Sequence, residues 1–213
     1  MTETPQQKAD RFKRICISIL AQSGNCEASQ HDFNATDSIQ SMCAAWRKYW
    51  QGLMNEVPDQ VVAAFSEFYP DFKTEINEAG IYYNEDARLG IVLIGNSDAP
   101  INLNFAKDAY ILGKATVILR NNASAICRHP QATVELHNSS RVTVQQGHGI
   151  ARDRSTLTTC CDAECYNSST VRITNATLTD RGHLAIYAYG TAKVNTFTDK
   201  GITLYDAAAI EIA

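Results

Sequence analysis

Cysteine and histidine side chains in the second half of the chain have the functional groups best suited to metal or redox chemistry. Cys160, Cys161 and Cys165 lie close together in the sequence, with His148 and Cys127 upstream of them. Thiolate and imidazole groups are the usual ligands of zinc. Adjacent residues of a strand point to opposite faces, however, so Cys160 and Cys161 are poorly placed to bind one ion. We therefore expect no metal site and interpret the cysteines as small apolar residues of the interior.

A second group of candidate side chains lies in the segment 146–155, which interrupts the pattern around it. The segment contains two glycines, and we expect it to form a loop. His148, Arg152, Asp153 and Arg154 could bind a small anionic ligand or a glycan there, because binding residues are often found on loops held by a rigid scaffold. The alternative is a corner of the chain that carries solvated charges.

Enzymes that cleave carbohydrates need acidic side chains close together, and a glycosidase needs a pair of carboxylates. The acids of the second half are dispersed, and only Asp162 and Glu164 share a local face. The sequence contains no Walker loop and no GxGxxG, HExxH or GxSxG motif. We therefore expect a binding protein rather than an enzyme, and no cofactor.

Composition limits the classes of partner. The 213 residues are 45% hydrophobic and 20% charged, with a net charge of −4. Nucleic-acid-binding domains are usually basic, so a nucleic-acid partner is not expected. No apolar run approaches the roughly 20 residues that span a bilayer, and the polar N-terminus does not have the pattern of a secretory signal. The expected location is the cytoplasm or a virion. The odd count of seven cysteines excludes a fully paired disulfide framework.

The first third of the chain has helical periodicity and is expected to form a helical N-terminal domain at 1–80. Thr4 is the candidate N-cap of the first helix, and the polar segment 26–35 is expected to be a loop. Pro70 should end or kink the third helix, and Gly80 should follow a short continuation of it. The three predicted helices cover Pro5–Gln22, about 37–54, and the segment from Pro58 to Pro70.

From Ile81 the periodicity changes to the alternation that is typical of β-strands. Each unit of about eight residues has a small residue, an apolar residue two positions later, and then a polar turn. Antiparallel hairpins favour Asn-Gly or Asp-Gly turns, which the repeat region does not contain, so we expect a parallel β-solenoid at 81–213. An antiparallel sandwich is the structural alternative. If three units form one coil, the coil has about 24 residues, and there are about four to five coils.

Asparagine recurs where the units meet. Asn tolerates the left-handed backbone that tight corners often require. A corner asparagine followed by a unit that opens with small residues gives an NxS/T sequence without any role in glycosylation. This repeat explains four of the five sequons, which begin at Asn122, Asn138, Asn167 and Asn175.

Several units resemble the octad repeats of parallel β-helix proteins from bacteriophages and gut-bacterial mobile elements, which have the pectin-lyase-like superfold. The units that carry the likeness are Ala115-Thr-Val117, Ala132-Thr-Val134, 184–190 and Ala192-Lys-Val194. The resemblance covers about half of the chain and implies an α+β protein in two parts, with a helical cap domain followed by a right-handed parallel β-helix.

The same resemblance implies a non-enzymatic binding or assembly protein, either a virion component or an accessory factor that contacts a host protein. The alternative is a pectin-lyase-like protein that binds or cleaves carbohydrate. An unpaired end of a solenoid tends to associate, so we also expect an oligomer or a protein partner at the C-terminal coil. The residues expected at this interface are Ile202, Leu204, Ile210 and Ile212.

Overall fold

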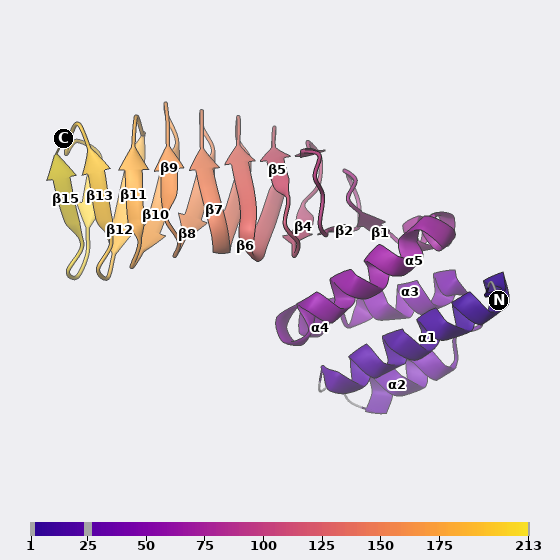
Figure 1. The fold of residues 1–213 in the computed structure, drawn as a ribbon. Helices are drawn as coiled ribbons and strands as arrows, with labels where there is room; N and C mark the ends of the chain where they lie inside the picture. Colours follow the sequence, from indigo (N-terminus) through magenta and orange to yellow (C-terminus); the bar gives the residue numbers. More distant parts are fainter. Residues whose placement is uncertain (1–2, 24–26, 213) are drawn as a thin grey trace. The chain divides into compact units, whose positions relative to one another are not determined.

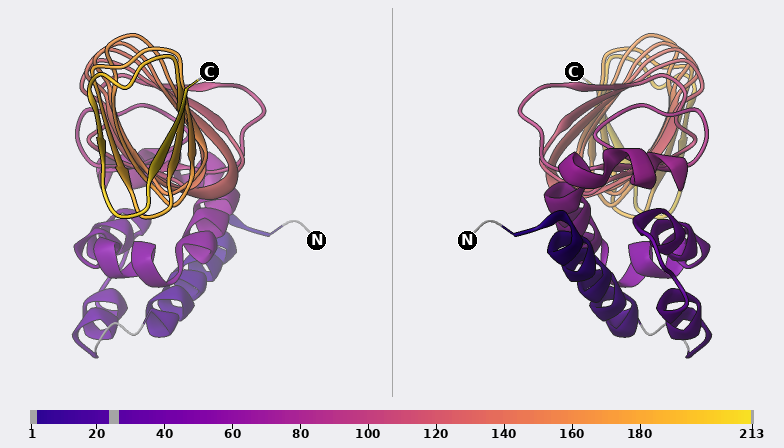
Figure 2. Two further views of the ribbon diagram at one scale, coloured as in Figure 1. Left: turned by 90° about the vertical axis from the view of Figure 1, so that its left-hand side faces the viewer. Right: turned by 90° about the vertical axis from the view of Figure 1, so that its right-hand side faces the viewer.

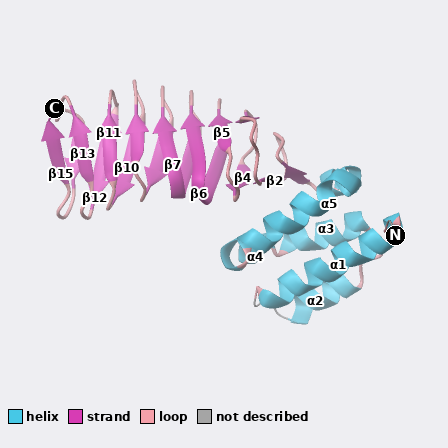
Figure 3. Cartoon of the chain, in the orientation of Figure 1, coloured by secondary structure: helices cyan, strands magenta, loops and turns pink. Residues whose placement is uncertain are grey.

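The computed structural model describes residues 3–23 and 27–212. The chain divides into two compact units, Met1–Tyr83 and Asn84–Ala213. All the helices of the described residues belong to the first unit, and the second unit is built from strands (Figures 1 and 3). None of these helices has the length and apolarity needed to cross a membrane.

The first unit confirms part of the helix prediction. The elements are α1 (Pro5–Gln22), α2 (Glu27–Asn34), α3 (Ile39–Lys48), α4 (Trp50–Glu56), α5 (Pro58–Glu78) and the short strand β1 (Ile81–Tyr83). Helix α1 has the predicted bounds, and Thr4 caps it by accepting a hydrogen bond from the Gln7 amide. The loop prediction is wrong for the residues of α2, whose Phe33 is fully buried and anchors the helix. Cys26 lies outside the described residues.

Two breaks divide the longer helices. The predicted second helix is interrupted at Tyr49, so α3 and α4 are separate, and Ser38 caps α3. The predicted kink in the third helix is confirmed, because Phe72 has non-helical angles two residues after Pro70. Gly80 has a φ of 78°, the left-handed conformation expected of a residue that follows a helix.

The second unit is a parallel β-solenoid with two strands in each coil. The first sheet contains β2 (Ile91–Ile94), β4 (Asp108–Ile111), the first parts of β6 (Ser124–Leu136) and β7 (Arg141–Ala151), β8 (Thr156–Thr159), β10 (Thr170–Thr174), β12 (Ala185–Tyr189) and β14 (Ile202–Leu204). The second sheet contains β3 (Ile101–Leu103), β5 (Thr116–Leu119), the later parts of β6 and β7, β9 (Ala163–Cys165), β11 (Thr177–Asp180), β13 (Lys193–Thr196) and β15 (Ala209–Ile212).

The predicted coil length and coil number are wrong. Ala109 pairs with Ala125 and Ile186 pairs with Ile202, so one coil has about 16 residues and the solenoid has about 8 coils. Two octad units, rather than three, make a coil because the two sheets face each other across a narrow interior. A Cβ added to Gly149 of the second sheet would lie only 2.9 Å from Leu157 Cδ1 of the first sheet.

Alternate residues of each strand fill this interior, as the period of two predicts. In β7, for example, Val142 and Val144 are buried while Arg141 and Thr143 are exposed. In the end-on views of Figure 2 the coils of the solenoid overlie one another. The strand register puts equivalent residues of neighbouring coils side by side, for example Val142 beside Leu157 and Ile186 beside Ile202.

The corners also agree with the asparagine prediction. Asn121, Asn138, Asp153 and Asn167 all have a φ between 56° and 58°. Their side chains link neighbouring coils, since the Asn121 amide donates to Asn138 Oδ1 at 3.3 Å and the Asn138 amide donates to Asp153 Oδ2 at 3.2 Å. The first of these corner residues is Asn121, one position before the sequon residue Asn122.

Candidate functional site

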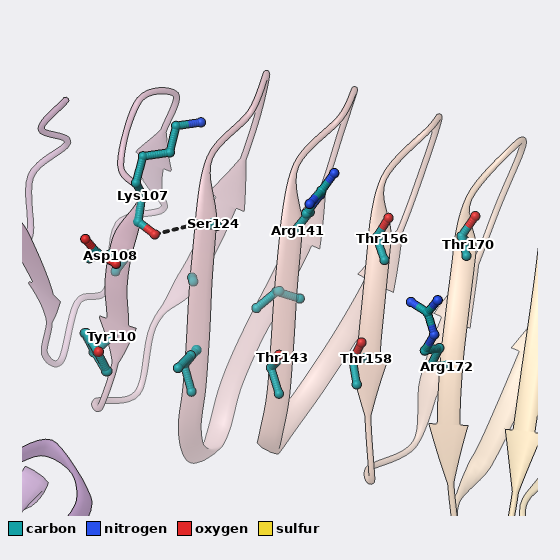
Figure 4. Close-up of a pocket in the computed structure, with 14 residues that line it drawn as sticks. Lys107, Asp108, Tyr110, Ser124, Arg141, Thr143, Thr156, Thr158, Thr170 and Arg172 are labelled. Carbon is teal, nitrogen blue, oxygen red and sulfur yellow. Dashed lines mark hydrogen bonds between the residues drawn. The ribbon is translucent and has the colours of Figure 1, made fainter. Parts of the chain in front are cut away.

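The outer face of the first sheet carries two parallel rows of polar side chains. In one row Arg141, Thr156 and Thr170 are in register, and in the other Thr143, Thr158 and Arg172 are in register. Figure 4 shows these side chains standing on β7, β8 and β10, with Tyr110 and Asp108 on β4. β-branched threonine suits the exposed face of a strand, and each hydroxyl can both donate and accept a hydrogen bond.

These rows line a groove of about 610 Å³. The residues that line it are Lys107, Asp108, Ala109, Tyr110, Ser124, Ala125, Ile126, Arg141, Val142, Thr143, Thr156, Thr158, Thr170 and Arg172. Lys107 adjoins β4, Arg141 lies on β7 and Arg172 on β10, so the cations recur at every second strand of the sheet. Neighbouring strands are about 4.8 Å apart, which puts successive cations about 10 Å apart along the solenoid axis.

The three cations differ in how firmly the protein holds them. Lys107 Nζ donates to the Asn122 carbonyl, and the Arg172 guanidinium lies 5.3 Å from the centre of the Tyr187 ring. Arg141 is exposed, and within the described ranges it forms no ion pair. Asp108 is the single acid among the groove residues. The groove therefore has a net positive charge in a protein whose overall charge is −4.

The candidate residues of segment 146–155 lie elsewhere, on the second sheet and the corner after it. The loop prediction is wrong for residues 146–151, which belong to β7; Gly149, Ile150 and Ala151 pair with strand β9. His148 Nε2 lies 3.5 Å from Glu164 Oε1. The hydrogen bond from Tyr166 and, more weakly, His148 lower the pKa of Glu164 against the opposing effect of burial.

Arg152 and Asp153 extend this set of paired charges. Arg152 Nε donates to Glu135 Oε1 at 2.6 Å, and its guanidinium lies 4.3 Å from the centre of the Tyr166 ring. His137 links Glu135 to Asp153, at 3.2 Å and 3.5 Å. Arg154 is exposed at the corner. The structure therefore brings His148, Arg152 and Asp153 into one network, defined here as the second-sheet network, and leaves Arg154 outside it.

Inside the solenoid, one carboxylate is surrounded by donors. Asp180 is 3% exposed and accepts hydrogen bonds from Thr196 Oγ1, the Gly182 amide and Cys165 Sγ. His183 Nδ1 lies 2.8 Å from Asp180 Oδ2, and His183 Nε2 lies 2.7 Å from the Lys200 carbonyl. Burial alone would raise the pKa of Asp180, but the hydrogen bonds and His183 outweigh it and hold that pKa below its usual value. These contacts join three successive coils.

The cysteine prediction is correct for some residues and wrong for others. Cys127 and Cys165 are buried in the solenoid, and burial raises the pKa of the Cys127 thiol to about 11. Cys160 is exposed and Cys161 half-buried, because they follow the last residue of β8 and form part of a corner. Among the described residues, no group of three or more His, Cys, Asp or Glu side chains is arranged to hold a metal ion.

The four residues expected at an oligomer interface lie on β14 and β15. Ile202 and Ile210 are half-buried, whereas Leu204 is 40% and Ile212 68% exposed. The contact of these side chains with a second copy stays a prediction.

The groove was not found from the sequence, although its signal is present there. Thr143, Thr158 and Arg172 follow one another at intervals close to the true coil length. The assumed coil of about 24 residues put these positions on different parts of the coil, so their alignment was missed.

Comparison with family models, with curated proteins and with solved structures gives no match for this chain. The fold defines it as a parallel β-solenoid preceded by a helical unit. A fold of this kind does not by itself imply a function.

Proposed function

We propose that this protein is a non-enzymatic binding protein whose ligand is an extended acidic glycan lying along the groove of the first sheet. The observation that carries the proposal is the regular spacing of Lys107, Arg141 and Arg172, which lie on or beside every second strand. A linear acidic polymer that turns an acidic group toward the groove at every second sugar would meet one cation at each disaccharide, because two strand spacings are about 10 Å.

The groups between the cations favour a sugar over other anionic polymers. The hydroxyls of Thr143, Thr156, Thr158 and Thr170 can exchange hydrogen bonds with sugar hydroxyls along the whole groove. Tyr110 and Tyr187 flank the region on β4 and β12. Single-stranded nucleic acid is typically bound by successive aromatic platforms in a strongly basic channel, which this groove does not resemble.

The test is affinity measured by calorimetry with polygalacturonate as the acidic probe and a neutral glucan of similar length as its counterpart. Arg141→Gln combined with Arg172→Gln should weaken polygalacturonate binding by about a hundredfold, since each charge-assisted contact contributes roughly 1.5 kcal/mol or more. Arg154→Gln combined with Lys193→Gln removes the same charge outside the groove and should leave the affinity within about twofold.

Equal weakening by the groove pair and the control pair would contradict the proposal, as would equal binding of the neutral glucan. Tighter binding of single-stranded DNA than of any acidic glycan would replace the glycan with nucleic acid. Shortening of the polymer during the titration would identify the chain as the carbohydrate-cleaving alternative, and the absence of new reducing ends supports binding without cleavage.

The octad units support a narrower proposal about origin and location. We propose that a bacteriophage or a mobile element encodes the protein, as a virion component or as a factor that contacts a host protein in the cytoplasm. Its presence in purified particles would support the first role. Capture of one host protein by wild type, with loss of capture when the groove arginines are changed, would support the second.

We also propose that Ile202, Leu204, Ile210 and Ile212 form an interface with a second copy of the chain. The support is the exposure of apolar side chains, Leu204 and Ile212 above all. Sedimentation at micromolar concentration should show an oligomer that Leu204→Ser and Ile212→Ser convert to monomer. A wild-type monomer under the same conditions would contradict it.

A further inference from the structure

Two adjacent thiols lie together at the surface of the solenoid corner that follows β8. Cys160 Sγ and Cys161 Sγ are each 3.4 Å from the same acceptor, the carbonyl oxygen of Gln145. The two side chains therefore converge on one side of the chain, although residues of a regular strand would diverge. Thr159 fixes this corner, since its Oγ1 accepts from the Cys161 amide at 2.9 Å and donates to the Cys161 carbonyl.

A disulfide between these neighbours is geometrically unfavourable. Adjacent Cα atoms across a trans peptide are about 3.8 Å apart, whereas disulfides usually join Cα atoms about 4.4 to 6.8 Å apart. Such a bond would be strained and easily reduced. Cys127 does not offer an easy alternative, because its thiol is buried and donates to the Gln146 carbonyl at 3.1 Å. The pair at 160 and 161 therefore stays available as a dithiol.

The protonation of Cys161 bears on the kind of ligand that the converging sulfurs would bind. Burial and the neighbouring Cys160 raise the pKa of Cys161, so near neutral pH this sulfur keeps its proton. A divalent cation such as zinc needs thiolates and must displace those protons. A neutral hydroxide of a trivalent metalloid has no such requirement, because its own hydroxyl groups carry the thiol protons away.

We propose that Cys160 and Cys161 form a chelating site for neutral trivalent metalloid hydroxides of the arsenic class. Two As–S bonds form and two As–OH bonds break, and each thiol proton leaves with a hydroxyl group as water. Arsenic remains trivalent and sulfur is not oxidised, so the step needs no oxidant. The gain over a single thiol is chelation, since the second sulfur is already at high effective concentration when the first has bound.

Phenylarsine oxide is the probe, added in slight excess to the full chain in the presence of excess glutathione. Its single oxygen takes both thiol protons and leaves as one water. Glutathione removes arsenic from single thiols, so only a chelating pair should retain it. Wild type should retain one equivalent in its intact mass, and both Cys160→Ser and Cys161→Ser should weaken retention by about a hundredfold.

Cys127→Ala and Cys165→Ala are the matched controls, because each removes a buried thiol of the same unit. Both should retain the probe, with the adduct mapped to the peptide that contains residues 160 and 161. Protection of both cysteines from maleimide labelling by the probe gives a second readout on wild type alone, which does not depend on the folding of any variant. Retention by either serine variant, or loss on removal of Cys127 with the pair intact, would overturn the proposal.

Discussion

The outer faces of the two sheets are both formed by parallel strands, but they differ in how their charged side chains are paired. On the second sheet and its corner, Arg152 has Glu135 as a partner and His148 has Glu164, so most charges are paired within the protein. On the first sheet, Arg141 and Arg172 stand among threonines, with Asp108 as the one acid in the groove. A charge that is paired internally contributes to the fold, whereas one left without an internal anion can bind a ligand.

The interior of the solenoid also holds a charged group that is paired within the protein. Asp180 is almost fully buried and accepts hydrogen bonds from several donors. The molecule thus has polar groups that are satisfied inside the protein and polar groups that are exposed in the groove, which the proposed glycan would contact. Variants of the first kind should lower the free energy of unfolding and leave glycan affinity unchanged. Variants of the second kind should lower the glycan affinity and leave the free energy of unfolding unchanged.

The largest expected effect is on stability, from Asp180→Ala. Removal of the carboxylate takes one acceptor from Thr196 and Cys165 and the nearby anion from His183 inside the solenoid. Loss of one partner of a buried pair typically costs about 3–5 kcal/mol. Urea unfolding followed by circular dichroism measures the change, with Asp199→Ala as an exposed acidic control. A loss below 1 kcal/mol, or the same loss in the control, would show that the buried network contributes little.

The same carboxylate predicts a pH dependence. The pKa of Asp180 is held below its usual value, so its contribution to stability is complete above the unfolded pKa of about 3.9 and is lost as the pH falls through the lower folded pKa. The difference in free energy of unfolding between wild type and Asp180→Asn should therefore shrink steadily below about pH 4. Urea titrations at several pH values measure it. A constant difference down to pH 2 would contradict this assignment.

A smaller effect is expected on affinity, from Thr143→Val combined with Thr158→Val. Valine has nearly the shape of threonine and suits a strand, so the free energy of unfolding should change by less than about 0.5 kcal/mol. Loss of two hydroxyls should weaken polygalacturonate binding by about 1–2 kcal/mol, or roughly tenfold. Thr116→Val and Thr133→Val make the same change on the second sheet and should not alter the affinity. Calorimetry gives both values, and equal weakening by the two pairs would remove the distinction between the faces.

The smallest expected effect is that of Glu135→Gln on the second sheet. The Arg152–Glu135 pair is partly exposed, so its loss should lower stability by about 0.5–1 kcal/mol. Glycan affinity should remain that of wild type, because the pair lies outside the groove. Thermal unfolding and calorimetry on the same sample provide the check. An affinity change larger than about threefold would show that the second sheet also takes part in binding.

Local signals in the sequence were sufficient for much of the fold. The Pro70 kink, the left-handed Gly80 and the asparagine corners each depend on the conformational limits of one residue type. The parallel solenoid followed from strand alternation without hairpin turns. The coil length could not be obtained in this way, because residues of either sheet alternate with the same period of two.

The groove was harder to predict than the fold, because its residues come from different strands and are brought together only by the register in which those strands pair. Arg141 and Arg172 are 31 positions apart in the sequence. They lie on the same face of the first sheet, two strands apart, and this placement can be predicted only if the coil length is known. The pairing of Arg152 with Glu135 has the same origin, and the binding of a ligand by Arg152 stays a prediction. The convergence of Cys160 and Cys161 depended on where β8 ends, at Thr159, and strand ends are poorly specified by alternation.

The proposed ligand is an acidic glycan that lies along the outer face of the first sheet. The most direct measurement is photo-crosslinking of a diazirine-labelled oligogalacturonate to the full chain, with the modified residues identified by mass spectrometry. Crosslinks should fall on outward-facing residues of β6, β7, β8 and β10, such as Ile126, Thr143 and Thr158, and excess unlabelled polymer should abolish them. Crosslinks concentrated on the second sheet, around Ile118 or Thr179, would contradict glycan binding along the first sheet.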